Sequence, residues 1–165
     1  MLATPAAIRH IEDHDWDDVR RIYADGIATA NATFETEVAL REDLEQRWVA
    51  GQVFVAETDG RVVGWSSVSP ASARHCYRGV GETSVYVDGA ARAQGIGKRL
   101  VEHQITAAET AGFWTLQTSI YPENRASLRI HEAAGFRVVG RRERIAQLNG
   151  LWRDTVVLEW RSVTP

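Results

Sequence analysis

Two glycines and three cationic residues gather near the middle of the sequence. Gly95 and Gly97 stand in the run Arg-Ala-Gln-Gly-Ile-Gly, and Arg92, Lys98 and Arg99 surround them. At the start of a helix the first N–H groups have no partner within the helix and carry partial positive charge. Glycine lets an anion approach such a backbone closely. The segment therefore predicts a phosphate or pyrophosphate site at a helix N-terminus.

Phosphate-binding motifs with other spacings do not fit this segment. A Walker A loop needs four residues between its first glycine and a Gly-Lys-Ser/Thr run. A dinucleotide-binding turn needs three glycines at the start of a βαβ unit and an acidic residue about 20 positions later. Spacing alone leaves one structural alternative open, in which the glycines only let a helix pack closely against its neighbours.

A strand before the glycines and a helix after them must position this site. Thr83, Val85 and Val87 alternate with Ser84 and Tyr86, which is typical of a strand rich in β-branched and aromatic residues. After the glycines, apolar residues recur at helical spacing, at Leu100, Val101, Ile105 and Ala108. The pattern predicts a strand, a turn and a helix in direct succession.

The other patterns predict a mixed α/β (α+β) domain over residues 1–165. Helices are expected at 16–27, capped by Asp13 or Asp15, at 40–48, with Leu40, Leu44 and Trp48 on its apolar side, and at 124–134, ended by Gly135. Strands are expected at 8–11, 53–57, 61–69, 114–119, 136–145 and 151–160, with hairpin turns at Asp59-Gly60 and Asn149-Gly150.

Composition excludes several classes of protein. A net charge of −3 and a pI of about 6.0 give no basic field for nucleic acid. No apolar run approaches the ~20 residues of a membrane span, and no signal peptide is visible, so we expect a cytoplasmic protein. The single cysteine, Cys76, excludes an internal disulfide, and the five histidines show no metal-ligand spacing.

Two motifs in this order resemble the GNAT acetyltransferase superfamily. Arg-x-x-Gly-x-Gly after Val-Tyr-Val is similar to its acyl-CoA pyrophosphate loop. Its second signature stands here as Asn124, Ser127, His131, Gly135 and Phe136. The resemblance covers nearly the whole chain and implies the GNAT fold, a mixed, mostly antiparallel sheet flanked by helices, with acetyl-CoA as cosubstrate.

A narrower resemblance is to the phosphinothricin/methionine sulfoximine N-acetyltransferase family. It rests on Thr33-Phe34-Glu35, residues 73–77, 82–87 and 131–136, and Gly150-Leu151-Trp152-Arg153-Asp154. It implies acetylation of the α-amino group of a small amino acid such as phosphinothricin, methionine sulfoximine or methionine sulfone. A protein or peptide N-acetyltransferase and a non-catalytic acyl-CoA sensor remain the alternatives, with a dinucleotide-binding module more distant.

The resemblance assigns the cofactor contacts. Backbone groups of the turn would hold the CoA pyrophosphate, and the preceding strand would offer its edge to the pantetheine arm. The residues concerned are Val85, Tyr86, Val87, Arg92, Ala93, Gln94, Gly95, Ile96, Gly97, Lys98, Asn124 and Ser127. Asn124 also suits a simple helix N-cap, and one residue can serve both purposes.

Two catalytic residues follow from the same resemblance. Glu82 would act as general base and accept the proton of the substrate amine through a water molecule, and its alternative is a solvated glutamate at a strand start. His131 would donate a proton to the thiolate leaving group, and its alternative is a packed helix histidine. The superfamily transfers the acetyl group directly, so we expect no covalent intermediate on Cys76.

The substrate contacts are expected in two loops and one strand, at Phe34, Glu35, Arg74, Tyr77, Glu82, Thr83 and Ser84. Arg74 is the predicted anchor for the substrate carboxylate, because arginine binds carboxylates bidentately. Trp152 and Asp154 lie where related proteins form a two-fold interface, so we expect a homodimer.

Overall fold

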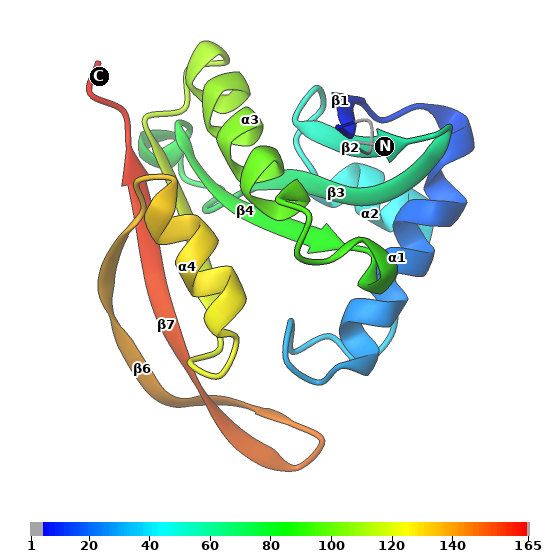
Figure 1. Cartoon of the computed structure of the whole chain (residues 1–165). Helices are drawn as coiled ribbons and strands as arrows, with labels where there is room; N and C mark the ends of the chain where they lie inside the picture. The colour runs from blue at the N-terminus through cyan, green and yellow to red at the C-terminus, as the bar shows by residue number, and fades with distance from the viewer. Residues whose placement is uncertain (1–4, 165) are drawn as a thin grey trace.

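All strands found between residues 5 and 164, the part of the chain that this computed structural model describes, join one sheet (Figure 1). Its order is β1-β2-β3-β4-β5-β7-β6. The elements are β1 (Ala7–His10), α1 (Trp16–Ala28), α2 (Arg41–Arg47), β2 (Val53–Thr58), β3 (Arg61–Pro70), β4 (Val80–Val87), α3 (Ile96–Thr110), β5 (Thr115–Ile120), α4 (Arg125–Ala133), β6 (Arg137–Leu148) and β7 (Leu151–Arg161). The predicted order of elements is confirmed.

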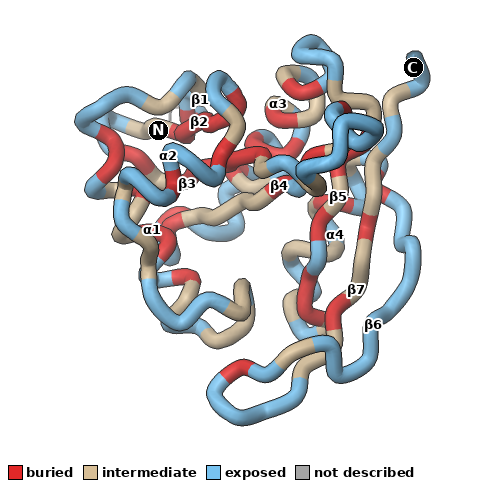
Figure 2. Tube along the Cα trace, turned by 180° about the vertical axis from the view of Figure 1, so that it is seen from behind, coloured by how far each residue is buried: buried red, intermediate tan, exposed pale blue. Residues whose placement is uncertain are grey.

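Helices cover both faces of the sheet. Apolar residues of α1 and α2, such as Ile22 and Leu44, pack with Trp65 of β3 in one core cluster. On the other face, Val101 of α3 packs with Leu116 of β5. In Figure 2 the buried segments run through the centre of the sheet, whereas β6 is exposed along almost its whole length. None of the helices between residues 5 and 164 has the length and apolar character that a membrane span requires.

The sheet opens between its two central strands. β4 and β5 form its one parallel pair, and their register covers only Val80–Glu82 against Thr115–Gln117. Beyond Glu82 the pairing of the two strands ends, while β4 stays paired with β3 as far as Val87. The edge of β4 that faces β5 therefore carries free backbone groups from Thr83 onward.

The turn predictions are confirmed. Asp59 and Gly60 both have positive φ, as do Asn149 and Gly150, which is the conformation that a two-residue hairpin turn requires. Gly135 follows α4 with φ +99°, in the left-handed half of φ space where glycine fits a helix end without strain.

One helix-end prediction is confirmed in position and one was wrong: Asp15 is the N-cap residue of α1, although its side chain makes no capping hydrogen bond to that helix, whereas Leu40 does not lie on the apolar side of α2. The turn Asp13–Asp15 precedes α1 as a 3₁₀ segment, and Glu12 is its N-cap. Asp15 is buried, accepts the Glu12 N–H at 2.7 Å and binds Arg9. Leu40 lies before α2 and is 61% exposed, because this helix has seven residues and turns only Leu44 and the following Trp48 into the core.

Candidate functional site

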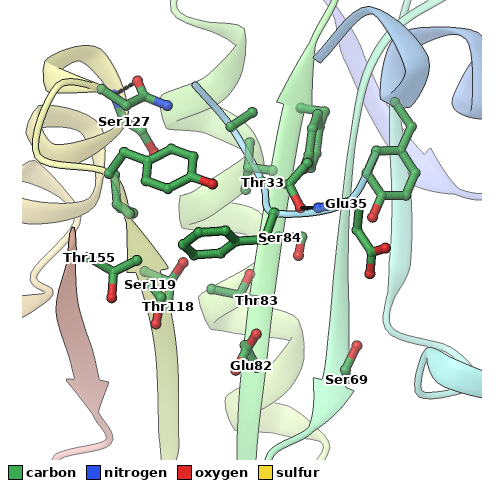
Figure 3. A pocket seen from close by; sticks show the side chains of 18 of the residues that line it. Thr33, Glu35, Ser69, Glu82, Thr83, Ser84, Thr118, Ser119, Ser127 and Thr155 are labelled. Atoms are coloured by element: carbon green, nitrogen blue, oxygen red, sulfur yellow. Dashed lines mark hydrogen bonds between the residues drawn. The ribbon is translucent and has the colours of Figure 1, made fainter. Parts of the chain in front are cut away.

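A cavity of about 550 Å³ lies where β4 and β5 separate (Figure 3). The loop after α1 contributes residues 32–35, β4 contributes residues 82–86, and the end of β5 contributes residues 118–121. The wall also includes His131 of α4, Thr155 of β7, Arg47 at the end of α2 and Trp48 directly after it. The sheet's opening, the α1 loop and the last hairpin therefore meet around one polar space.

Alternation along β4 sends its side chains to two sides of this space. Glu82, Ser84 and Tyr86 point toward α1 and α2, since Tyr86 stacks on Trp65 with ring centroids 4.6 Å apart. Thr83 and Val85 point toward α3 and α4, where Val85 packs against the second core cluster. Because the Tyr86 ring packs in the core, a ligand in the cavity would contact the backbone of Tyr86 and not its ring.

The glycine turn forms the expected start of a helix. Gly95 precedes α3 with φ +76°, and Ala93 has φ 62°. Residues 92–95 are exposed, and within residues 5–164 no backbone carbonyl accepts from the N–H groups of residues 93–98. A Cβ on Gly97 would lie 3.1 Å from Ile130 of α4. The glycines thus permit close packing and also leave a free row of N–H donors.

An ion pair holds the approach to this turn. Asp88 follows β4, is 8% exposed, and accepts the Ala90 N–H at 3.0 Å. The Arg21 guanidinium of α1 donates to the same carboxylate at 2.9 Å. The Ala90 N–H and the Arg21 charge lower the pKa of Asp88 below its usual range. The carboxylate therefore stays charged and ties the turn to α1.

The two motif residues at the start of α4 have a structural role. The Asn124 side chain accepts the Ser127 N–H at 3.2 Å, as the capping hypothesis predicts. The amide nitrogen of the same side chain donates a hydrogen bond to the carbonyl oxygen of Asn31 in the loop after α1, at 3.1 Å. Asn124 therefore fixes α4 against the loop that carries Phe34. Asn124 and Ser127 both line the cavity.

His131 is held in one orientation. It is 3% exposed, and its Nδ1 lies 2.8 Å from the Ser127 carbonyl oxygen, so Nδ1 carries the donated proton. Burial lowers the pKa of His131, against a smaller opposing effect of the Ser127 carbonyl. In the neutral ring Nε2 then has a lone pair and no proton. Nε2 is buried without a partner among the residues described, which differs from the proton donor that the resemblance implies.

Glu82 and Glu35 are the acidic residues of the wall. Glu82 is exposed and lies opposite Ser69 in the β3–β4 register, near the point where the strands part. Glu35 lies 3.4 Å from the Arg47 guanidinium, and both side chains are about half exposed. Phe34 packs edge-on against Tyr121, with ring centroids 5.1 Å apart. The predicted contacts at Phe34, Glu35 and residues 82–84 thus come together.

Other predicted residues lie elsewhere. Arg74 and Tyr77 do not line the cavity, and Arg74 instead lies 5.7 Å from the centre of the exposed Tyr77 ring. Cys76 is exposed in the same short turn. Trp152 is 58% exposed on β7, and Asp154 binds Arg141 of β6 at 2.6 Å. Arg74, Cys76 and Tyr77 thus lie in the loop between β3 and β4, outside the cavity of their own chain.

Many wall residues were missed from the sequence, and three of them carry polar groups on separate elements. Arg47 ends α2, Tyr121 follows β5, and Thr155 lies on β7. A position directly after a central strand is a recognised place for site residues, so Tyr121 carried a usable signal. Arg47 and Thr155 gave none, because each depends on how distant elements pack. In the region from residue 5 to 164, no group of three or more His, Cys, Asp and Glu side chains is arranged to hold a metal ion.

Comparison with known proteins identifies the family. The model of the acetyltransferase (GNAT) family matches residues 9–136. A phosphinothricin N-acetyltransferase of Alcaligenes faecalis is 32% identical over 160 residues, which cover 92% of this chain and 80% of that protein. The L-methionine sulfoximine/L-methionine sulfone acetyltransferase of Pseudomonas aeruginosa is 28% identical, with 93% of each chain covered.

A solved structure agrees with this assignment. The crystal structure of a GNAT superfamily phosphinothricin acetyltransferase from Sinorhizobium meliloti, in complex with AcCoA, has a TM-score of 0.87 and 26% identity. The match covers 96% of this chain and 89% of that one. This chain therefore belongs to the GNAT family of N-acetyltransferases and is related to its phosphinothricin and methionine sulfoximine acetyltransferases.

Proposed function

We propose that this enzyme transfers the acetyl group of acetyl-CoA to the α-amino group of a small amino acid. The best candidates are phosphinothricin, methionine sulfoximine and methionine sulfone. The observation that carries the proposal is the polar cavity in which Glu82, the free edge of β4 and the α1 loop meet. Its volume, about 550 Å³, is in the range of sites that enclose a small molecule.

The cofactor contacts follow the free edge of β4. Backbone groups of Val85, Tyr86 and Val87 would pair with the amides of the pantetheine arm, in the manner of an added strand. The edge leads to the turn from Arg92 to Lys98, whose free N–H groups would bind the pyrophosphate. Asn124 and Ser127 would contact the cofactor from the opposite wall.

Glu82 is the proposed general base. An α-ammonium group must lose a proton before its nitrogen can attack a thioester. Glu82 lies on the side of β4 that faces the α1 loop and opens to solvent, so a water molecule can connect it to the ammonium group. Such assistance typically contributes about 10²–10⁴-fold to the rate.

His131 serves the reaction as an acceptor. His131 lines the cavity from the α4 side, and its neutral Nε2, which has no partner among residues 5–164, can accept a hydrogen bond or a proton. The CoA thiolate can leave without an acid at this position, because an ordinary thiol has a pKa of only about 8.5. Direct transfer between the two substrates requires no thiol of the enzyme, which agrees with the position of Cys76 outside the cavity.

Two arginines are candidates for binding the substrate carboxylate. Arg74 is the anchor that the resemblance implies, and Tyr77 stands beside it. Arg47 is the arginine that lines the cavity of the single chain. We propose a homodimer, in which exposed apolar residues such as Leu151 and Trp152 of β7 are covered by a second copy. The mass of the protein in solution tests this assembly.

The activity is tested by measuring CoA thiol release from acetyl-CoA with a panel of amines. The panel contains phosphinothricin, methionine sulfoximine, methionine sulfone, glutamate, a polyamine and a basic peptide. Turnover of the first three supports the proposal. Turnover of the peptide alone would replace it with a peptide N-acetyltransferase. Acetyl-CoA binding without any turnover would favour an acyl-CoA sensor.

A further inference from the structure

Three buried hydroxyl groups that line the cavity have no hydrogen-bond partner among residues 5–164: that of Thr83, which points toward α3 and α4, and those of Tyr121 and Thr155. Tyr121 is 3% exposed and Thr155 is 4% exposed, and both line the cavity. The Tyr121 hydroxyl and the Thr155 Oγ1 contact no donor or acceptor among residues 5–164. A hydroxyl that is removed from water and left unpaired is destabilising, so such groups normally find a partner. A bound ligand is the natural partner for such hydroxyls in one cavity.

The hydroxyls of Tyr121 and Thr155 lie on the side of the sheet that carries Glu82. Glu82 is level with Gln117 in the parallel register, and Ser119 is level with Val157 in the antiparallel one. Alternation places Tyr121 and Thr155, each two residues along, on that same side. The Tyr121 ring accordingly meets Phe34 of the α1 loop. The two hydroxyls therefore face the amino-acid substrate rather than the cofactor side, where His131 lies.

Tyr121 is prepared to donate a hydrogen bond. The Arg153 guanidinium lies 4.0 Å from the centre of its ring and draws electron density from the phenol. Burial raises the pKa of Tyr121, and the Arg153 charge opposes this effect. The hydroxyl thus stays protonated at neutral pH while its hydrogen is polarised. The Arg153 guanidinium also donates a hydrogen bond to the Ala30 carbonyl oxygen at 2.8 Å.

The charges of the cavity wall disfavour a second anion on the substrate. Within the described chain the ionisable wall residues besides tyrosine are Glu35, Glu82, Arg47 and His131. Arg47 already lies beside Glu35, and buried His131 is neutral. A substrate carboxylate would use the charge of Arg47, the cation among these wall residues. Arg153 lies against the Tyr121 ring but does not line the cavity, and it donates to the Ala30 carbonyl and to the Glu123 carboxylate.

We propose that Tyr121 and Thr155 form a head-group subsite that binds an uncharged, oxygen-bearing side chain. This inference rests on the proposed function and narrows its substrate class. Sulfone and sulfoximine groups offer oxygen acceptors to two hydroxyl donors and carry no net charge. The phosphinate of phosphinothricin is anionic and would be the poorer fit. Methionine lacks these oxygens and would leave both hydroxyls unpaired.

The test compares kcat/KM for methionine sulfone, methionine and phosphinothricin. We expect the wild-type enzyme to prefer the sulfone over both others. The near-isosteric variants Tyr121→Phe and Thr155→Val should each lower kcat/KM for the sulfone about tenfold and change that for methionine less than about twofold. Thr106→Val, on the exposed side of α3, is the matched control and should change none of the three values.

The possible failures are distinguishable. Equal losses for sulfone and methionine in the two variants, or faster turnover of phosphinothricin than of the sulfone by the wild type, would overturn the subsite and leave the acetyltransferase assignment intact. No turnover of any of the three amino acids would overturn the proposed function and the subsite together.

Discussion

Replacing Arg21 with glutamine should weaken acetyl-CoA binding although this residue lies outside the cavity. Its guanidinium donates to the largely buried carboxylate of Asp88, which in turn accepts the Ala90 N–H just before the pyrophosphate turn. In Arg21→Gln that carboxylate keeps the Ala90 N–H and a more distant cation, Arg61 at 3.9 Å. The turn would then lose its tie to α1 and sample other conformations.

The size of the effect follows from the geometry. A hydrogen bond to a charged group contributes about 1.5–3 kcal/mol. The Arg21 side chain is 34% exposed, so solvent screening reduces this to about 1–2 kcal/mol. If this free energy holds the turn in its binding conformation, its loss should raise the Kd for acetyl-CoA about 5- to 30-fold. Because the carboxylate does not touch the amine substrate, kcat should change less than about twofold.

The matched control is Arg9→Gln. Arg9 also bridges two carboxylates, Asp15 at 2.7 Å and Glu57 at 2.6 Å, but it lies on β1 at the far edge of the sheet. Both variants should lose similar thermal stability, and only Arg21→Gln should raise the calorimetric Kd for CoA. The same Kd in both variants would refute the claim that the Arg21–Asp88 pair organises the turn.

Two further predictions concern the catalytic groups. Glu82→Gln should lower kcat by about 10²–10⁴-fold with an unchanged Kd for acetyl-CoA, and a wild-type kcat in thiol-release assays would remove Glu82 from the mechanism. Burial lowers the pKa of His131, so the unfolded chain binds its proton first as pH falls below about 6.5. The unfolding free energy should therefore be greatest above pH 6.5 and decline as pH falls through the lower folded pKa. In urea titrations between about pH 5 and 7.5, the unfolding free energy of His131→Asn should decline less steeply than that of the wild type. A smaller decline should remain in both proteins, because burial also lowers the pKa of His103. Equal slopes would contradict the buried neutral state of His131.

Local patterns predicted the elements of this fold well. The turns at Asp59-Gly60 and Asn149-Gly150 require positive φ, so two residues mark each hairpin. The helix after Gly95 was visible because its apolar face recurs along one segment. Leu40 has the right spacing for α2 but is exposed, because the length of a short helix depends on its packing partner.

The site was predictable only where one segment builds it. The pyrophosphate turn and residues 82–84 are continuous in sequence, and their grouping follows from a strand and a helix in succession. Thr155 lies on the same side of the sheet as Glu82 because of two separate strand registers, and no local pattern encodes those registers. The proton position on His131 depends on its bond to the Ser127 carbonyl. Arg74 had the right chemistry, but its loop points elsewhere.

The three residue pairs between β4 and β5 have a mechanical consequence. They are the only strand pairing between an N-terminal half, β1 to β4, and a C-terminal half, β5 to β7, within residues 5–164. A cofactor bound along the free edge of β4 and against α4 would contact both halves and connect them. Its binding free energy would then resist separation of the halves, about 2.7 kcal/mol at a concentration 100 times Kd. Amide hydrogens of residues 83–87 and of α4 should therefore both exchange more slowly in the cofactor-bound enzyme than in the free enzyme. The reactant acetyl-CoA would then also determine how rigid the enzyme is.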